Sequence, residues 1–181
     1  MIQLQNGRLI FNWLRQENAK YPRYEVIRDE FKSYWDQFLA FAVDESIGEV
    51  KPNQWEVTYL NHIPRTTVWN SVHDWDFLRT IARINSLDEV VALESRSGQM
   101  LFTIPENSGR LNVSWQHGRT EANSEVMVLN LTARGPVQTE TSGIAAPFSG
   151  LDLGRSVIVR SFEKLMSKEA NTFWGLKHAS G

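Results

Sequence analysis

Hydrophobic and polar residues alternate along several stretches of the chain, and a period of two predicts half-buried β-strands. The alternation begins near the amino terminus with Leu9, Phe11 and Trp13. The other alternating stretches are WEVTYLNHIP (55–64), GRLNVSWQH (109–117) and EVMVLNLTARG (125–135). In the stretch from Trp55, one face carries Trp55, Val57 and Tyr59, and the other carries Glu56, Thr58 and Leu60.

Turn residues predict how these strands are joined. In EVVALESRSGQMLFTI (89–104), Ser97-Gly98 predicts a tight turn between two strands. GRTEANSE (118–125) predicts a longer loop that joins the strands before and after it into a second hairpin.

Apolar residues at three- and four-residue steps predict two long helices. The first helix carries an aromatic stripe and has Pro22 in its first turn. Its stripe consists of Tyr24, Ile27, Phe31, Tyr34, Trp35, Phe38 and Phe41. The second helix starts near Asp152, and its stripe consists of Leu153, Val157, Ile158, Phe162 and Leu165. Because buried aromatic stripes usually pack against other elements, we expect the first stripe to lie in the core.

Shorter elements follow from capping residues. Ser167 predicts the start of a short final helix, which Gly175 ends. The segment 65–84 is ambiguous, and its later half predicts a short helix capped by Asp74. The stretch 135–150 is rich in small and polar residues and predicts a mobile loop.

Strands in antiparallel runs with helices set apart predict an α+β fold. We expect a single antiparallel sheet of about five or six strands, with both long helices on one face. The length of 181 residues predicts one domain over 1–181.

Composition narrows the class of protein. With 41% hydrophobic and 22% charged residues the chain is typical of a soluble globular protein. The absence of cysteine excludes disulfides, thiolate metal sites and a cysteine nucleophile, and it favours a cytoplasmic protein. A net charge of −2 gives no general attraction to nucleic acid or to a membrane, so we expect neither as a partner.

Asn61-His62, directly before the end of a predicted strand, raises the question of a site. An imidazole near a carboxylate is the usual material of a general base, so His62 with Glu56 or Asp74 is a catalytic candidate. The alternative is that the pair only caps the strand. The binding candidates are Tyr59, Asn61, His62, Arg134 and Arg155.

Other chemistry has weaker support. HDWD, His73 to Asp76, lacks the spacing of a metal site, and it favours acidic residues at a helix start instead. Neither a nucleophile elbow nor a phosphate-binding glycine loop occurs. Arg134, Arg155 and Arg160 form either an anion cluster or ordinary surface arginines. We therefore expect no metal and no cofactor.

Several motifs together resemble a sporadically distributed family of uncharacterised bacterial proteins. The motifs are QNGRLIFNW, YPRYE, EVTYLNHIP, GRLNVSW, LNLTARG and LDLGRSVIVRSF. The resemblance spans nearly the whole chain, but it carries no activity, cofactor or catalytic residue. Members commonly have a further segment before the first strand, so the resemblance implies a shortened or fragmentary member.

Three functions follow as hypotheses. The first is a non-enzymatic binding or interaction module of a bacterial accessory system, with a protein or small-molecule partner. The second is a hydrolase that uses His62 with Glu56 or Asp74. The third is a protein that holds a small apolar ligand in a cavity between sheet and helices.

Overall fold

The structure is a computed structural model that describes residues 1–5, 7–14, 22–79, 93–137 and 146–175. Contacts divide the chain into two compact units, which are considered separately. One unit comprises Met1–Asn53 and Val137–Ser149, and the other comprises Gln54–Pro136 and Gly150–Gly181. One domain over 1–181 stays a prediction.

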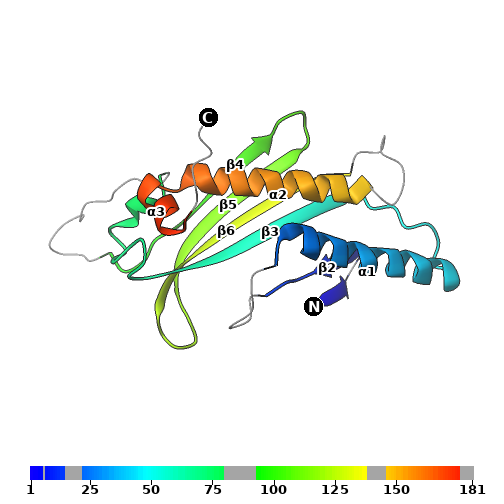
Figure 1. The fold of residues 1–181 in the computed structure, drawn as a ribbon, viewed down its shortest axis with the longest axis horizontal. Helices are drawn as coiled ribbons and strands as arrows, with labels where there is room; N and C mark the ends of the chain where they lie inside the picture. The colour runs from blue at the N-terminus through cyan, green and yellow to red at the C-terminus, as the bar shows by residue number, and fades with distance from the viewer. Residues whose placement is uncertain (6, 15–21, 80–92, 138–145, 176–181) are drawn as a thin grey trace. The chain divides into compact units, whose positions relative to one another are not determined.

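The second unit is built on a four-stranded antiparallel sheet (Figure 1). In spatial order its strands are β3 (Gln54–Pro64), β6 (Glu125–Pro136), β5 (Gly109–Arg119) and β4 (Ser97–Ile104). The alternating stretches thus form the three strands that the sequence predicts, and β5 and β6 form the predicted hairpin. The α+β class and the antiparallel sheet are confirmed.

The predicted turn at Ser97-Gly98 is wrong, because both residues lie inside β4. Gly98 pairs with Trp115, and a Cβ on Gly98 would lie 2.3 Å from the Trp115 indole. The glycine therefore makes room for a neighbouring ring rather than for a turn. The chain turns instead after Ile104, where Glu106 and Asn107 adopt φ values of 59° and 56°. Of the strand predicted before Ser97, residues 89–92 fall outside the described residues, and residues 93–96 do not form a strand.

A separate two-stranded hairpin opens the chain, so one sheet of about five or six strands is also wrong for the described residues. Strands β1 (Ile2–Gln5) and β2 (Arg8–Phe11) pair with each other and form their own sheet. The strand predicted through Trp13 ends at Phe11.

Helix α1 (Tyr24–Asp44) belongs to the same unit as this hairpin and carries the predicted aromatic stripe. Phe31 stacks on Phe11 of β2 at 6.1 Å and lies 5.9 Å from the Phe148 ring. The burial of the stripe varies along the helix, because Trp35 is buried whereas Phe41 is 50% exposed. Only part of the stripe therefore lies in the core. Pro22 precedes the helix rather than entering its first turn, since Arg23 is the N-cap.

Helix α2 (Ala146–Leu165) begins inside the stretch predicted as a loop over 135–150, whose residues 138–145 are not described. From Gly150 onward it lies across one face of the sheet (Figure 1). A Cβ on Gly150 would lie 2.1 Å from Trp55 of β3, and a Cβ on Gly154 would lie 2.7 Å from it. Two glycines one turn apart therefore let the helix backbone approach the Trp55 indole. The placement of α1 on the sheet stays a prediction.

Two short helices complete the second unit. In α3 (Lys168–Phe173) the Ser167 side chain accepts a hydrogen bond from the Ala170 N–H at 3.2 Å, which confirms the predicted cap. Gly175 follows with a φ of 69°, as predicted for a helix end. The element after Asp74 is a single 3₁₀ turn, η1 (Trp75–Phe77). None of the helices in the described part of the chain is both long and apolar enough to span a membrane.

The core of this unit lies between the sheet face beneath α2 and the short helices. Trp75, Phe77 and Leu78 are buried beside α3, and Leu78 forms a β-bridge with Met166. From the sheet the core takes Val113, Trp115, Leu129 and Leu131. Of the predicted α2 stripe, Ile158 and Leu165 are buried, whereas Leu153 is 37% exposed.

Candidate functional site

The two faces of the sheet differ sharply in chemistry. The inner face, which α2 crosses, carries the buried apolar residues of β3, β5 and β6. The outer face carries the alternate residues, which are mostly hydroxyl and amide side chains that are exposed or partly exposed. Because a strand turns successive side chains to opposite faces, this separation follows directly from the alternating sequence.

Pairing across the strands arranges the outer-face side chains in rows. One row contains Thr58, Thr132 and Asn112, and the next contains Leu60, Asn130, Ser114 and Gln99. The Thr58 and Thr132 hydroxyls hydrogen-bond at 3.0 Å, and the Gln99 amide donates to Asn112 Oδ1 at 2.8 Å.

A hollow of about 540 Å³, open to solvent, lies on this outer face. Its lining comes from all four strands: Leu60, Ser97, Gly98, Gln99, Ser114, Trp115, Gln116, Val128 and Asn130. None of these residues is charged. Asn130 Oδ1 is buried and accepts no hydrogen bond from the described residues. A buried acceptor without a donor is costly. Because Asn130 borders the hollow, a small rotation of its side chain would bring this oxygen within reach of a donor on a bound molecule.

The structure does not bring His62 and Glu56 together. Both lie on the outer face of β3, but they are six residues apart along one strand. At ~3.3 Å per residue their Cα atoms are separated by roughly 20 Å. Glu56 instead pairs with Arg134, which is its cross-strand neighbour on β6.

Tyr59 and Asn61 lie on the inner face, opposite to His62, as the alternation predicts. Asn61 Nδ2 donates to the Leu129 carbonyl on β6 at 3.4 Å, and the strand continues to Pro64. Asn61 therefore satisfies a backbone group within the sheet, and the pair does not cap the strand end. His62 is exposed beside this contact and pairs across the strands with Val128.

Asp74 is held within its own loop. Its carboxylate accepts hydrogen bonds from the backbone N–H groups of Asn70, at 3.1 Å, and Ser71, at 2.7 Å. The side chain makes no cap hydrogen bond to η1, so the predicted helix cap is wrong. No cluster of three acidic or histidine residues suited to a metal ion occurs among the described residues.

The three arginines of the possible anion cluster lie on different elements. Arg134 is on the outer face of β6, in its pair with Glu56. Arg155 is half-buried on α2, and Arg160 is exposed on the same helix. Since α2 crosses the inner face, Arg134 is separated from the helix by the sheet.

Glu125, at the start of β6, gathers a group of charges that sequence patterns did not reveal. It pairs with Arg65, lies 3.5 Å from Arg119 Nη2 and lies 3.8 Å from His117 Nε2. The hydrogen bond from Arg65 is the main cause that lowers the pKa of the Glu125 carboxyl below its usual value. The only sequence signal was the pairing of Arg119 with Glu125 at the hairpin end, which requires the register to be known.

This charge group is a poor catalytic site because its imidazole is enclosed. His117 packs edge-on against Trp69 at 6.1 Å and against Trp75 at 6.4 Å. Its Nε2 is buried without a hydrogen-bond partner in the described chain, so it cannot reach a substrate in solvent. Arg65 also donates to the Asn70 carbonyl at 2.6 Å. Through Arg65 and Glu125, these ion pairs and hydrogen bonds therefore connect the loop after β3 to the β5–β6 hairpin.

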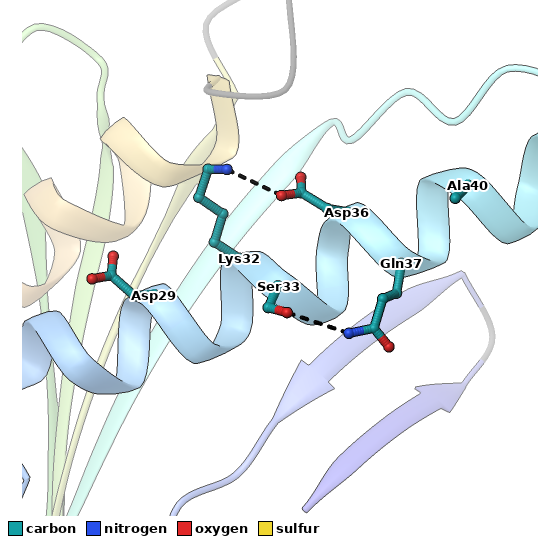
Figure 2. Close-up of a pocket in the computed structure, with 6 residues that line it drawn as sticks. All are labelled: Asp29, Lys32, Ser33, Asp36, Gln37 and Ala40. Atoms are coloured by element: carbon teal, nitrogen blue, oxygen red, sulfur yellow. Dashed lines mark hydrogen bonds and ion pairs between the residues drawn. The ribbon is translucent and has the colours of Figure 1, made fainter.

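A second hollow, of about 530 Å³, lies along one face of α1 (Figure 2). Its polar side chains bond one another at i, i+4 spacing. Lys32 Nζ contacts Asp36 at 3.1 Å, and Gln37 Nε2 donates to Ser33 Oγ at 3.3 Å. A shallow surface on a single helix with satisfied polar groups offers little to a ligand.

Comparison with known proteins adds no relative. No protein-family model matches the chain, and neither curated proteins nor solved structures give a match. The family resemblance of the motifs therefore stays a prediction.

Proposed function

We propose that this protein is a non-enzymatic binding module that holds a neutral polar ligand on the outer face of its four-stranded sheet. The observation that carries the proposal is the uncharged hollow with the unpaired Asn130 oxygen at its wall. Binding sites are commonly concave. This hollow is more polar than most such sites, because five of its nine lining residues carry hydroxyl or amide groups.

The lining chemistry indicates the ligand class. Ser97 and Ser114 supply hydroxyl groups, and Gln99 and Gln116 supply amides. These groups donate and accept hydrogen bonds without charge, so they suit a ligand with hydroxyl or amide groups. Leu60, which is 60% exposed, and Val128 provide apolar contact on the side of β3 and β6.

The other two hypotheses have less support. A hydrolase that uses His62 with Glu56 requires two groups that β3 holds far apart. In the alternative with Asp74, the carboxylate already accepts hydrogen bonds from the backbone N–H groups of Asn70 and Ser71. An apolar cavity between sheet and helix has no space at the contact between Trp55 and α2. There the indole occupies the space against Gly150 and Gly154.

NMR titration of the ¹⁵N-labelled protein tests the proposal. The probes are glucose, N-acetylglucosamine and N-acetylglycinamide, which carry neutral hydroxyl and amide groups. We expect at least one probe to shift the amide signals of Ser97, Gln99, Ser114 and Asn130. Ser114→Phe fills the hollow and should abolish these shifts, whereas Thr103→Phe, on the same face outside the hollow, should retain them.

Two results would overturn the proposal. One is that no probe shifts the signals of the hollow. The other is that the shifts persist unchanged in Ser114→Phe.

A further inference from the structure

Strand β4 lies at the edge of the sheet and lacks the features that usually protect an edge. Among the described residues it pairs only with β5, over all eight of its positions from Ser97 to Ile104. It contains no charged residue, no proline and no bulge. Leu101 is 59% exposed and Phe102 is 42% exposed. A long, regular, uncharged edge of this kind is a template for pairing with another strand.

The backbone groups directed away from β5 follow from the register. The His117 N–H donates to the Arg96 carbonyl at 2.9 Å, so Arg96 and His117 form a hydrogen-bonded pair. Hydrogen-bonded and non-bonded pairs alternate in an antiparallel ladder. The N–H and C=O groups of Ser97, Gln99, Leu101 and Thr103 are therefore directed outward.

We propose that β4 pairs antiparallel with β4 of a second copy of this chain. The two-fold axis passes beside Met100, so that Met100 faces its own counterpart. Gln99 then pairs with Leu101 of the other copy, and Ser97 pairs with Thr103. In this register each of the four outward N–H groups meets a carbonyl, and the two sheets join into one.

Side-chain sizes match in the same register. On the inner face the exposed Phe102 lies opposite Gly98 of the other copy, which has no side chain of its own. Trp115 of that copy covers Gly98 and offers its ring to Phe102. Because a large side chain opposite a glycine stabilises a strand pair, this arrangement favours self-pairing.

The absence of charge completes the argument for a second copy. An isologous contact places identical residues near one another at the two-fold axis, so a charge at Met100 or at its neighbours Gln99 and Leu101 would lie close to its own like. β4 has none. One pair of short strands buries little surface, so we expect a weak dimer rather than an obligate one.

Sedimentation equilibrium of the full chain tests the dimer. The mean mass should rise from 20.8 kDa toward twice that value as the protein concentration increases. Leu101→Pro removes one outward N–H group. An edge strand tolerates proline at such a position, but the lost hydrogen bond should keep the chain monomeric. Leu101→Thr keeps the N–H and should still dimerise. Leu101→Lys leaves the backbone intact and places like charges near the axis, so it should dissociate the dimer at low salt.

Cysteine cross-linking tests the register, since the chain has no cysteine of its own. Residues facing each other in a non-bonded pair have Cα atoms ~4.5 Å apart, within the range of a disulfide. Met100→Cys should therefore form a covalent dimer on mild oxidation, whereas Thr103→Cys should not. A wild-type chain that stays monomeric at every concentration would overturn the proposal, and so would equal cross-linking of the two variants. Neither result bears on ligand binding in the hollow.

Discussion

At the scale of single residues, Glu125 belongs to no recognisable motif, yet its carboxylate forms ion pairs with Arg65, which follows β3, and with Arg119 at the end of β5. Its carboxylate is ionised more readily than usual because Arg65 donates a hydrogen bond to it. A carboxyl whose pKa is lowered by folding stabilises the protein above its ordinary pKa of 4.5. That stabilisation is lost as the pH falls through the lowered value in the folded state.

Glu125→Gln should therefore be less stable than the wild type at neutral pH. The difference should shrink as the pH falls below 4.5, because the wild-type carboxyl then becomes protonated. Urea unfolding midpoints measured at a series of pH values check this. Glu121→Gln, at an exposed position in the same hairpin loop, is the control. Parallel pH curves for Glu125→Gln and the wild type would contradict the prediction.

The sequence makes His62 a catalytic candidate, but the structure gives it no carboxylate partner in Glu56. It is exposed on the outer face of β3, far from Glu56. His62→Gln should therefore change the free energy of unfolding by no more than about 0.5 kcal/mol, as is usual at the surface. Chemical denaturation measures this. A loss of several kcal/mol would indicate that the His62 side chain has a stabilising partner and is not simply exposed to solvent.

At the scale of elements, the contact between α2 and Trp55 depends on two glycines. Replacing a glycine by alanine inside an exposed helix normally stabilises the protein by up to about 1 kcal/mol. At Gly154 the added Cβ would lie 2.7 Å from the Trp55 ring and 3.1 Å from Val57 Cγ2. Gly154→Ala should therefore destabilise the protein, by about 1–3 kcal/mol, because the buried ring must shift.

The matched control is Arg160→Ala, on an exposed position of the same helix, which should change stability little. Thermal unfolding of both variants gives the comparison. If Gly154→Ala stabilises the protein instead, the distance between α2 and Trp55 must be larger than the structure indicates.

The sequence predicts elements well where one local period dominates. β3, β5 and β6 follow from alternation, and α1 follows from its aromatic stripe. The turn predicted at Gly98 was wrong because this glycine makes room for Trp115 on the neighbouring strand. A local sequence pattern does not contain that contact. The early start of α2 was missed because Gly150 is typical of a loop unless the Trp55 contact is known.

The candidate site could be predicted only in part, for the same physical reason. Alternation correctly separates Asn61 from His62 onto opposite faces. It does not give the register that sets Glu56 against Arg134, or the strand order that gathers Ser97, Ser114 and Asn130 around one hollow. These depend on pairing between residues far apart in sequence, and a slip of one residue would reverse every face.

At the scale of the whole molecule, the proposed function requires that the inner face of the four-stranded sheet forms the core and that the outer face is open to solvent. Single cysteines test this directly, because the chain has no native cysteine to react. Ser114 and Val113 are neighbours on β5, but Ser114 lines the hollow whereas Val113 is fully buried. Their thiol-labelling rates should therefore differ widely.

The measurement compares the reaction of Ser114→Cys and Val113→Cys with a thiol reagent, each under native conditions and in urea. We predict that Ser114→Cys, which is partly exposed, reacts in the folded protein without unfolding, although more slowly than in the unfolded chain. Val113→Cys should react only as fast as the protein unfolds. Protection of Ser114→Cys to the same degree as Val113→Cys would mean that the outer face is covered, and a reversed order would mean that the strand register is wrong.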